Sequence, residues 1–269
     1  MLITVNGLVV HSYPSGNSDR IIHILTEDHG RLSVMVKGGA KQKGSAAAPL
    51  QLFTYGNYEL YQGRGGDLYW YRGGSVLNSF FELSSDLTAV ALAAYLCDVA
   101  ADMTPEETNE EDGGLLLRDL LNSLYVLSNG MKSPTLIKAV FELRAAALMG
   151  YRPDLTGCSL CGAYDPEASY LDVMNGCLIC ADCKTKRNRI REVGHSDEEL
   201  RGRNILCPVS PSVLSAMRYV SEAPPKKIFS FSMKDSEEER AMDRVTETFL
   251  LNQLEKDYDT LHFYRSVSI

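Results

Sequence analysis

The first eighty residues place apolar side chains at every second position, which is the period of a strand with one buried face. Residues 31–37 are the clearest case, because polar and apolar side chains alternate from Arg31 to Lys37. Further strands are predicted over residues 3–10, 20–26, 52–61 and 67–76. Five short strands in so few residues predict a small closed β-barrel of the OB type over residues 1–80.

The period changes after residue 80. Apolar residues at steps of three and four predict helices over residues 87–103, 114–127, 135–149 and 210–220. The run from Ser236 to Glu239 matches a capping box and predicts the start of a last helix, which carries Met242, Val245 and Phe249 on one side. The fold class is therefore a multi-domain α+β protein, in which a helical domain over residues 81–269 follows the barrel.

Four cysteines stand inside this helical domain as two Cys-x-x-Cys pairs, Cys158/Cys161 and Cys180/Cys183, with eighteen residues between the pairs. This spacing is typical of a tetrahedral Zn²⁺ site, because each pair forms a tight knuckle that points two thiolates at one metal. Four thiolates leave no open coordination position, so we expect one structural zinc ion in a module at about residues 156–192. The alternatives are unpaired structural thiols or a redox pair.

A fifth cysteine leaves the ligand set open. Cys177 lies three residues before Cys180, so Cys177/Cys180 is a possible second pair. We favour Cys180/Cys183, because Gly176 and Cys177 are expected to form a turn. Cys97 falls on the apolar positions of a predicted helix and is expected to be a core residue, and Cys207 has no evident partner.

The same cysteine usage bears on the compartment. Seven cysteines are an odd number, and the first residues lack the basic stretch and apolar core of a signal peptide. A reducing cytoplasm is therefore expected. No run of eighteen apolar residues occurs, so a membrane span is not expected.

Charge is distributed unevenly along the chain. The formal net charge is −8, which on average disfavours nucleic acid as a partner. Residues 1–80 nevertheless carry seven Lys or Arg against five Asp or Glu, whereas residues 81–157 carry five against twelve. The stretch from Arg31 to Lys43 contains no acidic residue, and its cations are candidates for phosphate contacts. A second basic run, residues 184–191, either extends that surface or is a solvated tail of the zinc module.

Aromatic residues crowd the fourth and fifth predicted strands. Half of them must fill the barrel core, and the alternate ones face outward, where they can stack on bases beside Arg64 and Arg72. The six are Tyr55, Tyr58, Tyr61, Tyr69, Trp70 and Tyr71.

Several local stretches, in this order and spacing, are similar to a known family, the bacterial recombination mediator RecO. They are Gly7-Leu8-Val9, residues 18–22, Leu25 to Leu32, Lys37 to Ala40, Leu50 to Phe53, Phe141 to Arg144, and Leu148 to Leu155, which leads into Cys158. The resemblance covers essentially the whole chain. It also implies the same order of parts: an OB barrel, a helical domain and a four-cysteine zinc insertion.

The resemblance implies a DNA repair and recombination mediator rather than an enzyme. Such proteins bind single-stranded and double-stranded DNA and anneal complementary strands. With RecR, and in some organisms RecF, they help load RecA onto DNA coated by single-strand binding protein (SSB). Cytoplasmic, nucleoid-associated localisation is implied as well.

Site residues follow from the resemblance together with position and charge. The DNA-binding candidates are Arg20, Arg31, Lys37, Lys41, Lys43 and Arg64. Arg144 and Arg152 are candidates for the basic rim of a pocket that receives the acidic, hydrophobic SSB tail.

Two other functional classes stay open. The first is a zinc-ribbon adaptor that touches only proteins. The second is an enzyme, either a thiol oxidoreductase or a zinc hydrolase, although the chain has no Gly-rich phosphate loop, no His-Glu-x-x-His and no Gly-x-Ser-x-Gly.

Overall fold

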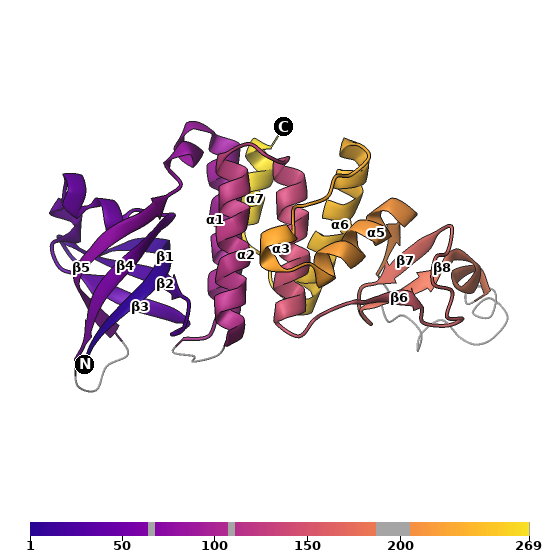
Figure 1. Ribbon diagram of the computed structural model, residues 1–269, viewed down its shortest axis with the longest axis horizontal. Coiled ribbons are helices and arrows are strands. Elements are labelled where there is room, and N and C mark those ends of the chain that lie inside the picture. Colours follow the sequence, from indigo (N-terminus) through magenta and orange to yellow (C-terminus); the bar gives the residue numbers. More distant parts are fainter. Residues whose placement is uncertain (64–67, 107–110, 187–204, 269) are drawn as a thin grey trace. The chain divides into compact units, whose positions relative to one another are not determined.

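A computed structural model describes residues 1–63, 68–106, 111–186 and 205–268 (Figure 1). The chain divides into two compact units. The first contains residues 1–134 and 258–269, and the second contains residues 135–257. The domain boundary expected between residues 80 and 81 remains a prediction.

Five strands form the closed barrel of the first unit, in the spatial order β1-β2-β3-β5-β4 (Figure 1). They are β1 (Leu2–Ser15), β2 (Asp19–Thr26), β3 (Arg31–Val36), β4 (Thr54–Gln62) and β5 (Leu68–Ser79). β1 closes the barrel, because its first half pairs with β4 and its second half pairs with β2. This arrangement confirms the predicted OB-type barrel.

The barrel interior is filled by alternate side chains of every strand. Ile22, Ile24, Val34 and Leu60 are fully buried in it, as period-two burial requires. Gly7 is needed where β1 crosses β2, because a Cβ at this position would lie 2.5 Å from Ile24 Cγ2.

The segment between β3 and β4 is built of tight turns. It forms consecutive 3₁₀ turns over Gly39–Lys41 and Gly44–Ala46. Gly38 and Gly44 adopt positive φ angles of 63° and 60°, a conformation that glycine tolerates without strain. The basic residues of this segment are therefore carried on tight turns.

Three helices complete the first unit: α1 (Leu87–Met103), α2 (Glu111–Ser128) and α7 (Asp259–Val267). The Asp86 carboxylate caps α1 by accepting a hydrogen bond from the amide of Thr88 at 2.8 Å. α7 was not predicted, because its nine residues are too few to show a clear helical repeat of apolar positions. It is held to α1 by the Thr260 hydroxyl, which donates to Asp98 at 2.6 Å.

The second unit combines helices with a small sheet. The helices are α3 (Pro134–Leu148), α5 (Pro211–Glu222) and α6 (Ser236–Leu254). The sheet has the order β6-β8-β7-β9, formed by β6 (Asp154–Cys158), β7 (Ser169–Asp172), β8 (Cys177–Cys180) and β9 (Leu206–Val209). β9 was missed in the sequence because it contains Pro208, which an edge strand tolerates and a central strand does not.

The start of α6 corrects one prediction. Asp235, rather than Ser236, is the N-cap, and its carboxylate accepts from the amides of Glu237 and Glu238 at 3.0 Å each. Ser236, which the capping-box match had assigned as the N-cap, is instead the first residue of the helix. Among the helices described, none is both long and apolar enough to cross a membrane.

Candidate metal centre and nucleic-acid interface

The two Cys-x-x-Cys knuckles come together at the ends of β6 and β8. The thiol sulfurs of Cys158, Cys161, Cys180 and Cys183 all lie within 4.8 Å of one another, and the sulfurs of Cys161 and Cys180 are 3.8 Å apart. Gly162 and Gly176 have φ angles of 76° and 60°, as expected for the turns beside the site. Four convergent thiols are a donor set that can hold a metal ion.

Hydrogen bonding in the cluster shifts the pKa values of Cys158 and Cys183 in opposite directions. Burial raises the pKa of the Cys158 thiol, but backbone amides directed at its sulfur outweigh this and lower it to about 6. One of these amides is that of Cys180, at 3.3 Å from the Cys158 sulfur. Hydrogen bonds to the thiols of Cys180 and Cys161 raise the pKa of Cys183 to about 12. Since adjacent thiolates repel one another, full ionisation requires a bound cation.

The other cysteines of the described chain lie outside this cluster. Cys177 begins β8 rather than occupying the turn, and its thiol donates to the Ser159 hydroxyl at 3.5 Å. Cys180 and Cys183, rather than Cys177, therefore complete the four-thiol cluster. Cys97 is fully buried in α1, as predicted, and burial raises its pKa. Cys207 lies in β9.

Most of the predicted DNA-binding cations lie on the barrel surface. Lys37 directly follows β3, and Lys41 and Lys43 lie on the 3₁₀ turns; all three are exposed. Arg20 is half-buried near the start of β2. Arg64 lies outside the described residues.

Arg31 has a different environment from the other predicted cations. Its guanidinium donates to the Ala101 carbonyl at 3.0 Å and pairs with Glu106 at 2.9 Å. It thus ties β3 to the end of α1 and the segment that follows.

The outward aromatic side chains carry cations on their rings. Tyr58 and Tyr69 are buried in the barrel and Tyr71 packs partly buried against the same core, as expected for half of the set. Trp70 and Tyr61 instead lie on the outer surface: the Lys37 ammonium is 4.8 Å from the Trp70 ring centre, and the Arg72 guanidinium is 5.4 Å from the Tyr61 ring centre. The structure therefore brings Lys37, one of the predicted DNA-binding residues, to a half-buried aromatic ring on the outer face of the barrel.

The basic run after the last knuckle is described only at its start. The Lys184 ammonium lies 3.5 Å from the Tyr170 ring centre, and Lys186 is exposed. The remaining cations of that run, from residue 187 onward, lie outside the described residues.

The two candidate partner-binding arginines differ in accessibility. Arg144 is buried and donates to the carbonyls of Val220 and Ala223 at the end of α5, so it caps a helix. Arg152 is half exposed, pairs with Glu222, and lines a cavity of about 470 Å³. The cavity is also lined by Pro153, Asp154, Leu155, Thr156, Tyr164, Arg218 and Ser221.

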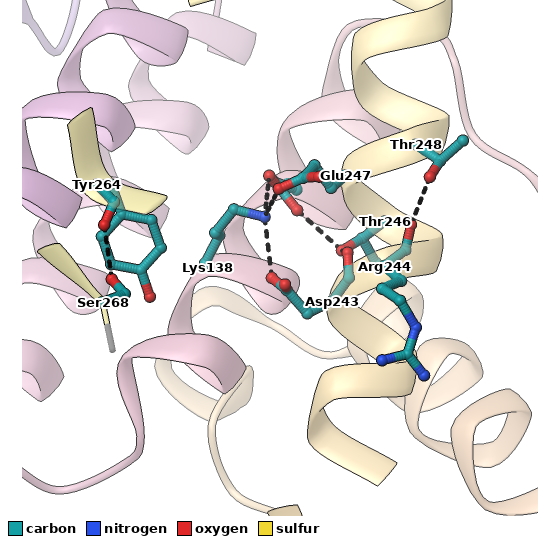
Figure 2. Close-up of polar contacts among 9 residues, drawn as sticks. Lys138, Asp243, Arg244, Thr246, Glu247, Thr248, Tyr264 and Ser268 are labelled. Atoms are coloured by element: carbon teal, nitrogen blue, oxygen red, sulfur yellow. Dashed lines mark hydrogen bonds and ion pairs between the residues drawn. The ribbon is translucent and has the colours of Figure 1, made fainter. Parts of the chain in front are cut away.

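A buried charge cluster of the second unit was missed in the sequence. The Lys138 ammonium on α3 is 2.9 Å from both Glu142 and Asp243 and 2.8 Å from Glu247 (Figure 2). Thr246 donates to the other Glu142 oxygen at 2.9 Å. Lys138 and Glu142 are fully buried, whereas Asp243 and Glu247 retain about a fifth of their exposure. The i,i+4 spacing of Lys138 and Glu142 can be read from the sequence. The approach of Asp243 and Glu247 from α6 to Lys138 cannot, because it depends on the packing of α6 on α3.

Glu142 gives a predicted pH dependence of stability. Burial raises its pKa from 4.5 to about 7, although Lys138 opposes the shift. Between these values the folded state binds more protons than the unfolded one, so stability rises as the pH falls through about 7 towards 5. We expect a gain on the order of 3 kcal/mol, measured by urea unfolding followed by circular dichroism. Glu142→Gln should remove this dependence, and an unchanged profile in that variant would contradict the assignment.

A closed OB-type barrel followed by a helical region with a four-thiol cluster defines a modular α+β class of protein. Family models match nearly the whole chain: "Recombination protein O N terminal" covers residues 1–80, and "Recombination protein O C terminal" covers residues 84–262. The chain therefore belongs to the RecO family, which confirms the resemblance found in the sequence.

Curated relatives agree over the full length. The DNA repair protein RecO of Acetivibrio thermocellus is 27% identical over 265 residues, which span 98% of this chain and 97% of the relative. The protein of the same name from Caldicellulosiruptor bescii is 25% identical, with 99% of each chain covered. That of Clostridium acetobutylicum is 27% identical over 87% of this chain and 86% of its own.

Proposed function

We propose that this protein is a non-enzymatic mediator that binds single-stranded DNA on its barrel and anneals complementary strands. One observation carries the proposal: Lys37, Lys41 and Lys43 are exposed on the OB-type barrel, and Lys37 lies over the outward Trp70 ring. Cations that meet phosphates and rings that stack on bases are the two parts of a single-strand site.

The proposed partners extend the same role. Together with RecR, and with RecF where it is used, the protein would help load RecA onto SSB-coated DNA, and double-stranded DNA would bind through the same cations. Of the two arginines expected to meet the SSB tail, Arg152 is the better candidate, because it lines a cavity whereas Arg144 is buried. We place this activity in the cytoplasm, at the nucleoid.

The proposed metal is one structural Zn²⁺, held by Cys158, Cys161, Cys180 and Cys183. Four sulfur donors at knuckle spacing suit zinc and leave no position for a reacting water. When bound, the ion neutralises the thiolates and fixes the two knuckles. Strand annealing needs no metal-catalysed step, so the role proposed for the ion is structural.

Charge reversal on the 3₁₀ turns tests DNA binding. We expect Lys41→Glu with Lys43→Glu to weaken single-strand binding at low salt. The plot of log affinity against log salt should become shallower, its negative slope losing about two units of magnitude, since each lost phosphate contact removes about one. Fluorescence anisotropy of a labelled single strand over a salt series measures both quantities.

A matched control is Lys226→Glu with Lys227→Glu, which reverses two adjacent exposed lysines in the second unit. This control should keep the wild-type affinity and slope. If annealing is unaltered by reversal at Lys37, Lys41 and Lys43 together, the zinc-ribbon adaptor is the better description.

A further inference from the structure

A continuous row of apolar and aromatic side chains crosses the outside of the barrel. The strand register makes each member the direct neighbour of the next: Tyr61 on β4 is opposite Trp70 on β5, and Trp70 is opposite Met35 on β3. The row continues to Leu2 on β1 and to Ile21 on β2. We call these five residues the aromatic row.

The alternation of burial along each strand places this row outside. Leu60, Tyr69 and Val34, each adjacent to a row member, are buried in the barrel core. Side chains alternate between faces along a strand, so the row members point away from the core. Leu2 is 65% exposed and Tyr61 39% exposed.

Cations occupy the aromatic members of the row. Lys37 lies over Trp70 and Arg72 over Tyr61, and the chain's amino terminus donates to the Gln62 carbonyl beside Tyr61 at 2.7 Å. Glu59, an exposed carboxylate two residues before Tyr61, is the acidic side chain on the same face of β4. The described cations, Lys37, Arg72 and the amino terminus, outnumber the two carboxylates that share a strand face with row members, Glu59 on β4 and Asp19 on β2, which suits a polyanion.

We propose that a single DNA strand crosses the barrel along the aromatic row, with neighbouring bases stacked on Trp70 and Tyr61. This inference rests on the proposed function and specifies where the strand lies. Direct cross-strand neighbours are about 5 Å apart, so adjacent bases of one strand can reach both rings.

Lys37 and Arg72 make the replacement of a cation by a base over each ring favourable. In the free protein each is held over a ring by an exposed cation–π contact, which is weaker than the stacking of a base on the same ring. When a base replaces the cation, Lys37 and Arg72 become available to the phosphates on either side, and counterions are released. Because the bases of a duplex are paired and stacked internally, the row favours a single strand over a duplex.

Trp70 is the only tryptophan of the chain, so its fluorescence reports directly on this site. We expect oligo(dT) to quench the emission of the full-length protein. Trp70→Ala and Tyr61→Ala should each bind oligo(dT) about tenfold more weakly, the typical loss for one stacking ring. Trp70→Phe should keep most of the affinity. Phe81→Ala, which removes an exposed aromatic of the same unit outside the row, should bind as the wild type does.

Two failures can be told apart. If the wild type binds oligo(dT) without quenching, and both alanine variants bind it normally, the path over the row is wrong while DNA binding stands. If the wild type binds no strand even at low salt, the proposed function itself fails. Circular dichroism of each variant verifies that the barrel is folded.

Discussion

Lys138→Met is expected to destabilise the helical unit by about 3–5 kcal/mol, the usual cost of removing one partner of a buried ion pair. Lys138 is 1% exposed and lies within 2.9 Å of three carboxylates. Burial lowers its pKa, but Glu142, Asp243 and Glu247 together raise it above its usual range. Without the ammonium, the fully buried Glu142 carboxylate loses its 2.9 Å ion pair, while Thr246 still donates to its other oxygen. Since this loss is a large fraction of a typical domain's stability of about 5–15 kcal/mol, the urea midpoint of the helical unit should fall sharply.

A set of variants separates lost pairing from lost packing. Lys138→Met combined with Glu142→Gln should recover much of the stability, because no charged group then remains fully buried. Glu247→Gln should cost far less, since this side chain is partly exposed and two carboxylates still neutralise Lys138. Urea unfolding followed by circular dichroism gives the free energies. A Lys138→Met variant as stable as the wild type would mean that the cluster is hydrated and not buried.

Local patterns were sufficient to predict the barrel and the four-cysteine site. The alternation from Arg31 to Lys37 specifies one face of a strand without any knowledge of its neighbours, and α1 begins and ends where its apolar repeat does. The cysteines are equally local, because each knuckle is four residues long and its spacing reflects the geometry of the ligands. Both features could be predicted because few other structures fit the same local sequence pattern.

Features that depend on distant residues were not predictable. The pairing of Arg31 with Glu106 is created by the packing of the barrel on α1, whereas the DNA contact expected of Arg31 stays a prediction. Arg144 was assigned to a partner surface, yet the end of α5 buries it. The Lys138 cluster joins two helices more than a hundred residues apart. A charged residue in a sequence does not indicate whether its partner is water, a ligand or another element of the fold.

Loss of the proposed zinc ion should have the largest effect on the second unit. Structural zinc contributes an apparent binding free energy of about 10–16 kcal/mol in small modules, which is as large as the whole stability of a typical domain, about 5–15 kcal/mol. The sheet around the site has four-residue strands β7, β8 and β9, and three of the four cysteines form a small apolar cluster with Ile179. Such a small core cannot stay folded without the metal, so Cys180→Ser should unfold the module.

The structure provides both a control and an independent reporter for this experiment. Cys177→Ser changes a thiol three residues away that bonds to Ser159 and lies outside the four-thiol cluster, so it should retain one zinc per chain and the wild-type melting curve. Zinc released by a thiol-modifying reagent and measured with a colorimetric indicator gives the stoichiometry. Trp70 lies in the barrel, and its emission should be the same in Cys180→Ser and the wild type if only the module unfolds. If Cys180→Ser binds zinc as tightly as Cys177→Ser does, the ligand set inferred from the sulfur positions is wrong, because three remaining thiolates hold the ion less tightly than four.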